Sequence, residues 1–343
     1  MYDDIVLKLQ KEHRLSAAEY KELLVNPVYD SALQEAARRQ ALEIFGNEIY
    51  IRGLIEFTNY CKNNCYYCGI RAGNKNVERY RLTKDDILLC CEHGYELGFR
   101  TFVLQGGEDK LFTEEILCDI VSAIRKEFPD CAITLSFGEL PRSMYQSLFD
   151  SGANRYLLRH ETANPIHYSK LHPENLSHEN RIKCLYDLKE IGYQVGCGLM
   201  VGSPYQTVDN LVEDLMFIGD FKPHMVGIGP FIPHKDTPFA HYSAGSVQMT
   251  LKLLSIIRLM EPRVLLPSTT ALASLMPDGC EQGILAGANV VMPNLSPDIA
   301  KSKYILYNNK SSVGAQDANA LLVLRQRLNK IGYTISNSRG DYN

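Results

Sequence analysis

Short hydrophobic runs of strand length alternate along the chain with amphipathic segments of helix length. The eight hydrophobic runs cover residues 48–57, 101–105, 132–137, 155–160, 194–201, 225–232, 264–270 and 289–294. Short apolar runs of this kind are typical of strands that are buried on both faces. Their alternation with helical patterns predicts repeated strand–helix units, which build parallel sheets through right-handed crossovers.

The segments between the runs carry helix start and stop signals. Amphipathic patterns begin after Thr113, Ser177 and Thr207, whose hydroxyl groups can accept from the first free backbone N–H groups of a helix. Gly192 and Gly219 follow the second and third patterns. Because glycine readily adopts the left-handed conformation that ends a helix, we expect these helices to stop there.

Eight strand–helix units in about 250 residues predict an α/β fold of the (β/α)8 TIM-barrel type. An open, doubly wound sheet is the alternative. We expect an N-terminal helical extension over residues 1–47, the barrel over 48–300 and a C-terminal closing segment over 301–343, with a helix at 318–332. In such a barrel the chemistry occurs at the carboxyl ends of the strands.

Composition narrows the class of protein. The 343 residues are 45% hydrophobic and 22% charged, which indicates a folded globular protein, and the net charge of −4 argues against a nucleic-acid binder. We find no apolar run of about 18 residues and no apolar signal core in the opening MYDDIVLKLQ. We therefore expect a cytoplasmic protein without a membrane span, whose ten cysteines are free thiols or metal ligands.

Three cysteines, Cys61, Cys65 and Cys68, cluster directly after the first predicted strand. A structural zinc site would need a fourth, distant ligand, and no second C-x2-C follows. Three unrelated core cysteines are a further alternative, but the residues between Cys61 and Cys65 are polar. Thiolates also hold iron–sulfur clusters, and three of them on a 4Fe–4S cube leave one iron open for chemistry.

The spacing C-x3-C-x2-C after a first barrel strand, with Tyr67 before the last cysteine, resembles the signature of radical S-adenosylmethionine (SAM) enzymes. This resemblance implies that Cys61, Cys65 and Cys68 ligate a 4Fe–4S cluster whose open iron binds the amino and carboxylate groups of SAM. One electron from the cluster would then cleave SAM to a 5′-deoxyadenosyl radical that attacks the substrate.

Later strand ends fit the same resemblance. The segment QGGED (105–109) resembles the GGE motif that meets the amino group of SAM, and Arg159, His160 and Glu161 place charges that we expect to face a polar cavity. The resemblance implies that Glu161 and Arg181 bind SAM. The full set of expected cofactor contacts is Tyr67, Gln105, Gly106, Glu108, Thr134, Ser136, Glu161, Arg181, Met200 and Ile232.

Within this superfamily the chain is similar to the HydE-type maturases of FeFe-hydrogenase. The similar segments are RYRLT (79–83), RHETANP (159–165), GIGPFIPH (227–234) and ANVVMPNLSP (288–297), and the likeness extends over residues 1–307. It implies a role in building the H-cluster from a cysteine-bearing iron–carbonyl–cyanide precursor, with HydF-type and HydG-type partners. It also implies a substrate cavity lined by Arg159, Thr269, Thr270, Tyr304 and Tyr307.

One feature departs from that likeness. Some of these maturases hold a second cluster near the C-terminus, whereas this chain has no cysteine after Cys280, so we expect no second cluster. Cys197 and Cys280 are expected to be packing residues, and the sequence assigns no role to Cys131. The alternatives are an enzyme similar to methylornithine synthase or to biotin synthase, and, in another class, a non-enzymatic iron–sulfur electron carrier or scaffold.

Overall fold

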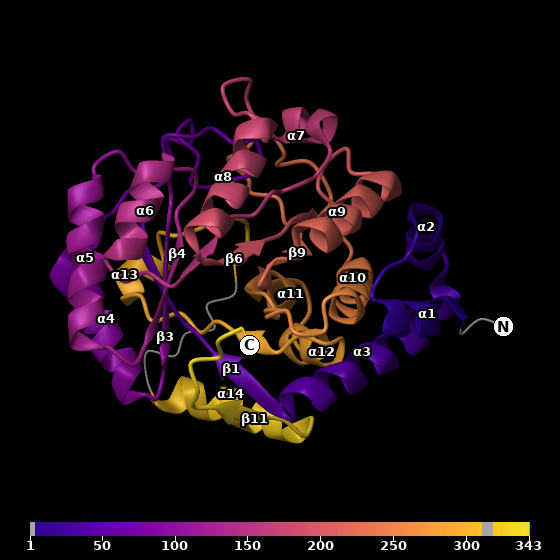
Figure 1. Ribbon diagram of the computed structural model, residues 1–343. Helices are drawn as coiled ribbons and strands as arrows, with labels where there is room; N and C mark the ends of the chain where they lie inside the picture. The colour runs from indigo at the N-terminus through magenta and orange to yellow at the C-terminus, as the bar shows by residue number, and fades with distance from the viewer. Residues whose placement is uncertain (1–3, 311–317, 343) are drawn as a thin grey trace.

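A parallel β-sheet runs through the middle of the computed structural model, which describes residues 4–310 and 318–342 (Figure 1). Six parallel strands follow the order β2–β3–β4–β5–β6–β8. They are β2 (Gly53–Thr58), β3 (Thr101–Gly106), β4 (Ala132–Ser136), β5 (Arg155–Leu157), β6 (Gln194–Cys197) and β8 (Met225–Val226). Every residue of β2 is buried, the polar Glu56 and Thr58 included, as expected for a strand covered on both faces.

Two smaller parallel sheets continue this arrangement. One pairs β7 (Met200–Val201) with β9 (Gly229–Pro230), and the other has the order β10 (Val290–Val291), β1 (Glu48–Ile51), β11 (Thr334–Ser336). Single parallel bridges add the remaining runs, because Leu265 pairs with Met225 and Asn294 pairs with Leu54. Each of the eight predicted runs thus contains a strand or a parallel bridge, and the predicted parallel α/β fold is confirmed.

Several of the predicted runs are interrupted where two segments pass very close together. Residues 194–201 form β6 and then β7, and residues 225–232 form β8 and then β9. Gly198 lies in the first interruption and Gly227 in the second. A Cβ on Gly198 would lie 2.0 Å from the Gly227 carbonyl oxygen, so only glycine fits there.

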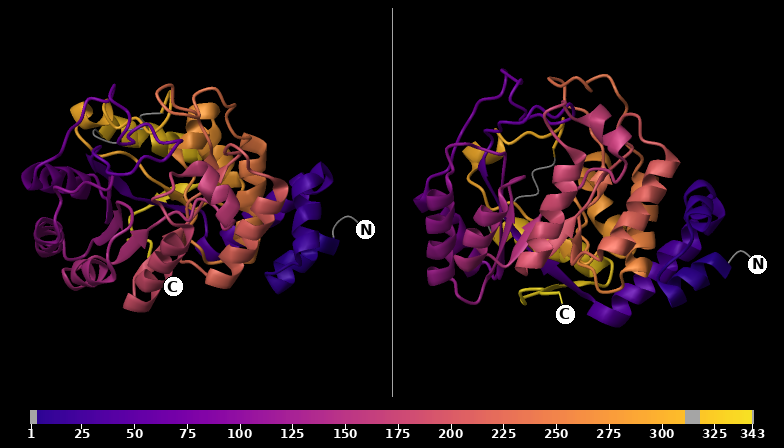
Figure 2. Two further views of the ribbon diagram at one scale, coloured as in Figure 1. Left: turned by 90° about the horizontal axis from the view of Figure 1, so that it is seen from above. Right: turned by 45° about the horizontal axis from the view of Figure 1, so that its top comes forward.

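Helices lie around the strands in both views of Figure 2. The crossover helices are α4 (Lys84–Glu96), α5 (Glu114–Glu127), α6 (Arg142–Asp150), α7 (Pro165–Leu171), α8 (His178–Ile191), α9 (Val208–Phe221), α10 (Val247–Met260), α11 (Thr270–Leu275), α12 (Gly279–Leu285) and α13 (Asp298–Lys301). In the described part of the chain, no helix combines the length and the apolar character needed to cross a bilayer.

The predicted helix starts are confirmed. Thr113, Ser177 and Thr207 are the N-caps of α5, α8 and α9, and each side chain accepts from a backbone N–H of the first turn. Gly192 ends α8 with φ 109°. The stop expected at Gly219 is wrong, because α9 continues to Phe221, whose ring is fully buried and holds the last turn against the core.

Both ends of the chain pack against the central unit. The N-terminal helices are α1 (Asp4–Glu12), α2 (Ala17–Val25) and α3 (Asp30–Phe45), with a 3₁₀ turn at Pro27–Tyr29. Here α3 packs on α10, and Lys252 of α10 forms an ion pair of 2.6 Å with Asp30. The predicted C-terminal helix is present as α14 (Ala318–Lys330), while β11 was not predicted.

Residues after β11 lie at the amino ends of the central strands. Arg155, the fully buried first residue of β5, donates to the carbonyl oxygens of Arg339 (3.1 Å) and Gly340 (3.0 Å) and pairs with Asp341 (2.7 Å). The chain end therefore covers the end of the sheet opposite to the cysteine loop.

Candidate functional site

Cys61, Cys65 and Cys68 lie on the loop that follows β2, at the carboxyl end of the sheet, and all three are half-buried free thiols. Burial raises the pKa of each thiol, to about 12 for Cys68. Neighbouring thiols raise the pKa of Cys65 and Cys68 further. A bound cationic group would reverse this effect, because metal ligation removes the thiol proton.

The chemistry of this donor set fits an iron–sulfur cube. Within residues 4–310 and 318–342, no three His, Cys, Asp or Glu side chains converge closely enough to hold a single metal ion. A cube does not need that convergence, because each thiolate ligates a different iron. The half-exposed thiols in a polar loop therefore fit a cluster better than a structural zinc or a hydrophobic core.

A single guanidinium group shapes the cysteine loop. Arg79 donates to the carbonyl oxygens of Ile70 (2.8 Å), Arg71 (2.7 Å) and Asn74 (3.2 Å), and also to that of Asn59. Four backbone acceptors are thus satisfied from one side chain. Since a loop without regular structure must satisfy its buried carbonyl groups in some other way, Arg79 fixes the path of the cysteine-bearing segment.

The glycines of QGGED let β3 approach that loop. A Cβ on Gly107 would lie 2.2 Å from the Tyr60 carbonyl oxygen. The Glu108 carbonyl oxygen accepts from Lys62 N–H at 2.9 Å, and the Glu108 carboxylate lies 3.0 Å from the Lys62 ammonium group. Gly106 is likewise packed against β2, so the expected close approach of this motif is present.

The end of β5 holds two charged side chains with unused hydrogen-bonding capacity. Glu161 is buried and has φ 65°, a left-handed conformation that is uncommon for residues with a Cβ. Its Oε2 lies 3.4 Å from Nη2 of Arg159 without hydrogen-bond geometry. Among the described residues, Glu161 Oε2 and the Arg159 Nε and Nη2 atoms have no hydrogen-bond partner.

His160 points away from these two residues, so the expectation that all three face a polar cavity is wrong for it. The ring is fully buried, and its Nδ1 accepts from the Gly198 N–H at 3.2 Å. Its Nε2 lies 3.4 Å from Asp214 of α9. Glu161 N–H donates to the Gly198 carbonyl oxygen at 3.0 Å, so both peptide groups of Gly198 are tied to the end of β5.

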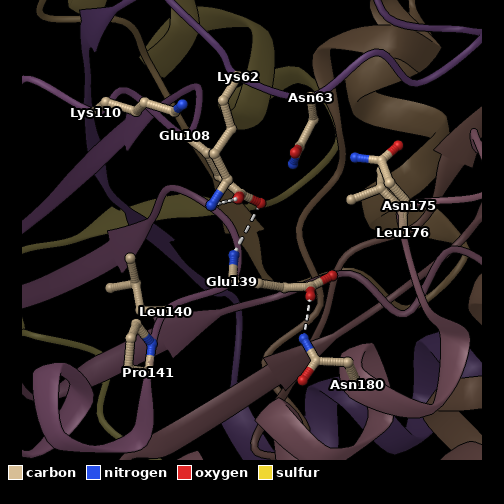
Figure 3. A pocket seen from close by; sticks show the side chains of 10 residues that line it. All are labelled: Lys62, Asn63, Glu108, Lys110, Glu139, Leu140, Pro141, Asn175, Leu176 and Asn180. Carbon is tan, nitrogen blue, oxygen red and sulfur yellow. Dashed lines mark hydrogen bonds and ion pairs between the residues drawn. The ribbon is translucent and has the colours of Figure 1, made fainter.

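A pocket of about 520 Å³ opens beside the cysteine loop (Figure 3). Glu139, just after β4, lies in it, and Asn180 donates to its Oε2. Arg181 Nε lies 2.7 Å from Glu139 Oε1. Burial lowers the pKa of Arg181, but the Glu139 carboxylate acts together with Tyr168, Tyr67 and Glu108, and the net shift is upward. Arg181 is therefore a buried cation whose partner here is Glu139.

Tyr67 is oriented by a histidine on the segment after α7. Its hydroxyl group lies 3.1 Å from Nε2 of His172, whose Nδ1 lies 3.0 Å from the Tyr168 carbonyl oxygen. Because a carbonyl oxygen only accepts, Nδ1 carries the proton, and Tyr67 donates to Nε2. Burial lowers the pKa of His172 to about 3, which keeps this neutral form.

The other predicted site residues lie on strands or on the segments that follow them. Gln105 Nε2 is 3.5 Å from the Tyr304 hydroxyl, and Thr270 Oγ1 is 3.1 Å from the Tyr307 hydroxyl. The buried hydroxyl groups of Thr134 and Thr269 have no hydrogen-bond partner among the described residues. Met200 packs with Phe231 and Phe239, Ile232 is buried, and Ser136 is half-buried.

Several residues of this region escaped the sequence analysis. Glu139 could have been found, since it follows a strand end as Glu108 does. Nothing in the neighbouring sequence indicates the role of His172, or the ion pair between Lys310 and the fully buried Glu56. Asn294 also donates to Glu56 at 2.8 Å. Glu56 and Lys310 are far apart in sequence, so only the folded chain brings them together.

Comparisons with known proteins agree on one superfamily. A sequence model described as the radical SAM superfamily matches residues 55–218. The [FeFe] hydrogenase maturase subunit HydE of Thermotoga maritima is 42% identical over 96% of this chain and 94% of its own. The 3-methylornithine synthase of Methanosarcina barkeri is 30% identical over 78% of this chain and 75% of its own.

Solved structures give the same result. The crystal structure of methylornithine synthase (PylB) superposes with a TM-score of 0.84 at 26% identity and covers 97% of both chains. The crystal structure of HydG, described as a maturase of the [FeFe]-hydrogenase, has a TM-score of 0.81 at 22% identity, covering 97% of this chain and 75% of that one. At this identity the likeness to HydG shows the fold alone.

Proposed function

This chain belongs to the radical SAM superfamily, and from that premise we propose that it is a HydE-type maturase that acts in assembly of the FeFe-hydrogenase H-cluster. It is an enzyme that uses a 4Fe–4S cluster and SAM, as its superfamily does. The observation that carries the proposal is the 42% identity to a HydE maturase along nearly the whole chain, with the cysteine loop and the charged end of β5 at the same end of the sheet.

We assign the cluster to Cys61, Cys65 and Cys68. When bound there, the cluster would supply the electron for reductive cleavage of the sulfonium of SAM. The chain supplies a loop held by Arg79, carboxylates for the amino and ribose groups of SAM, and a cation for its carboxylate. Our proposed SAM contacts are Tyr67, Gln105, Gly106, Glu108, Thr134, Ser136, Glu161, Arg181, Met200 and Ile232.

We propose that the substrate lies beyond the SAM site, in a cavity lined by Arg159, Thr269, Thr270, Tyr304 and Tyr307. The Arg159 guanidinium group and the Thr269 hydroxyl group have polar atoms without hydrogen-bond partners among the described residues. Such atoms favour a substrate with carboxylate, cyanide or carbonyl groups, because each new hydrogen bond satisfies a group that is already desolvated. This supports a cysteine-bearing iron–carbonyl–cyanide precursor as the substrate.

We further infer that the sheet and its bridges form a (β/α)8 barrel over residues 48–300, with a helical extension at 1–47 and a closing segment at 301–343. The bridge from Leu265 to Met225 joins the seventh run to β8, and the bridge from Asn294 to Leu54 joins the eighth run to β2, which supports this. We propose the cytoplasm as its compartment and HydF-type and HydG-type proteins as its partners.

A methylornithine synthase is the second candidate, because two such synthases are 29–30% identical over 78% of the chain and PylB superposes over 97% of it. The anaerobically reconstituted protein should be incubated with SAM, dithionite and either L-lysine or the cysteine-bearing iron complex. We expect more 5′-deoxyadenosine than in the reaction without substrate only when the iron complex is added. Methylornithine formed from lysine would establish the second candidate, and no 5′-deoxyadenosine from a fully loaded sample would exclude both.

A further inference from the structure

The backbone of Glu161, rather than a hydrogen bond of its carboxylate, sets the position of this side chain. Glu161 has φ 65°, and its buried Oε2 has no hydrogen-bond partner among the described residues. A residue with a Cβ keeps a left-handed conformation only where the surrounding structure fixes it, and such residues are concentrated at functional positions. The groups that hold the neighbouring peptides therefore decide where the carboxylate lies.

One carboxylate contacts the chain on both sides of Glu161. Asp214 of α9 is buried, and its Oδ1 accepts from the Ala163 N–H at 2.5 Å. The same oxygen lies 3.4 Å from Nε2 of His160, outside hydrogen-bond geometry. In the sequence, His160 directly precedes Glu161 and Ala163 follows it by two residues. Asp214 therefore holds the segment at two positions with Glu161 between them.

The ring of His160 carries its proton on the nitrogen that faces Asp214. Its Nδ1 accepts from the Gly198 N–H at 3.2 Å, so the neutral ring has its proton on Nε2. Both side chains are buried, and a carboxylate attracts a buried N–H group more strongly than one in water because less solvent screens the charge. The Phe217 ring, 4.7 Å away, packs against the imidazole. The ring is thus fixed between α9 and Gly198.

Gly198 connects this ring to the backbone of Glu161. Its carbonyl oxygen accepts from the Glu161 N–H at 3.0 Å. A Cβ on Gly198 would lie 2.0 Å from the Gly227 carbonyl oxygen, so the two chains are in close contact and this peptide has little room to move. These contacts form a continuous path from the carboxylate of Asp214 to the backbone of Glu161.

We propose that Asp214 is a positioning residue for SAM. Through His160 and Ala163 it holds Glu161 in the left-handed conformation, so that the carboxylate is in place before SAM binds. Such preorganisation strengthens binding, because the group that meets the ligand does not have to be ordered at that moment. The inference rests on the proposed function, in which Glu161 contacts SAM.

Asp214→Asn tests the proposal in a double-mutant cycle with Glu161→Ala. Asparagine keeps the shape of the side chain and removes the charge that attracts His160. We expect the dissociation constant of SAM, measured by calorimetry on the reconstituted protein, to rise about tenfold. In the Glu161→Ala protein the same change should alter it by less than about twofold, because the carboxylate that Asp214 positions is absent. A residue that only stabilises the fold would weaken SAM binding equally in both proteins.

Asp187→Asn is the matched control. Asp187 is also a buried acidic residue of a helix, and on α8 it pairs with Arg142 (3.1 Å) and Lys183 (2.5 Å). It has no contact with the segment that carries Glu161 in these ion pairs. SAM affinity of this variant should stay within about twofold of the wild type.

His160→Asn and His160→Leu test the path through the ring. Both variants lose the imidazole, but Oδ1 of asparagine takes the place of Nδ1 and can accept from the Gly198 N–H. Leucine has a similar size and no acceptor. SAM should therefore bind about three- to tenfold more tightly to the asparagine variant than to the leucine variant.

Equal losses of SAM affinity from Asp214→Asn with and without Glu161 would overturn the inference, as would unchanged affinity in the single variant. If Asp214→Asn does not fold, equal SAM affinities of the two His160 variants would overturn it. Unchanged SAM affinity in Glu161→Ala alone would instead contradict the SAM contact in the proposed function. Methylornithine formed from lysine would contradict the proposed HydE-type activity and leave the cycle as it is, because the cycle is measured without substrate.

Discussion

Glu161 should be replaceable by glycine with a gain in stability and a loss of cofactor affinity. Its φ of 65° costs a residue with a Cβ about 1–2 kcal/mol, and its buried Oε2, which has no hydrogen-bond partner among the described residues, costs a further ~1–3 kcal/mol. Glycine removes both costs. It adds about 0.5–1 kcal/mol of unfolded-state entropy and loses the 3.4 Å contact with Arg159, worth under about 1 kcal/mol.

The net effect of Glu161→Gly is a gain of about 1–2 kcal/mol in the free energy of unfolding of the apoprotein, measured by urea denaturation under anaerobic conditions. SAM affinity, measured by calorimetry on the reconstituted protein, should fall about 10- to 100-fold, because a charge-assisted hydrogen bond of about 1.5–3 kcal/mol is lost.

Glu161→Ala separates the two effects. It removes the carboxylate but keeps a Cβ in the left-handed backbone, so it should lose the same affinity yet be about 1 kcal/mol less stable than the glycine variant. The reasoning fails if glycine is the less stable of the two, or if SAM affinity is unchanged in both. Iron and sulfide contents should match the wild type, because Glu161 is no cluster ligand in the proposal.

Three further changes probe other parts of the site. Because His172 has a depressed pKa, its contribution to stability is complete above pH ~6.5 and is lost at about 1.4 kcal/mol per pH unit as the pH falls toward 3. The free energy of unfolding of His172→Gln in urea should therefore depend less on pH between 7 and 5 than that of the wild type. Equal pH dependence in the two proteins would contradict this. Cys65→Ala should lose the cluster absorbance but keep its far-UV spectrum, whereas wild-type iron content in that variant would exclude Cys65 as a ligand. Lys310→Met should lower the free energy of unfolding by about 3–5 kcal/mol because it leaves Glu56 buried and unpaired, and Glu56→Gln in the same chain should restore part of the loss.

The parts of the fold that could be predicted from the sequence depend on interactions between residues that are close together in the chain. Thr113, Ser177 and Thr207 cap helices through hydrogen bonds to residues three positions away, so a short window contains the whole interaction. The division of residues 194–201 into β6 and β7 depends on Gly198 meeting Gly227, which lies between β8 and β9. Long-range contacts of this kind carry no signal in the alternation of polar and apolar residues.

The same distinction applies to the site. The three cysteines occupy one loop, so their spacing could be recognised in the sequence. Their role as cluster ligands stays a prediction. His160 was misjudged because β5 ends at Leu157, and beyond it the strand period no longer decides which way a side chain points. The pair of Arg181 and Glu139 joins a helix to the loop after β4, so neither residue alone indicated a partner.

Hydrogen-bond partners separate structural arginines from those available to a ligand. Arg258 is fully buried and donates to three carbonyl oxygens and to Asn289, and Arg155 is equally satisfied by the chain end. Arg52 lacks partners on two nitrogens but lies at the amino end of β2, away from the cysteine loop. Arg159 alone among these four combines unpartnered nitrogens with a position at the carboxyl ends of the strands. An anionic substrate group therefore gains most at Arg159, because its hydrogen bonds there replace none within the protein.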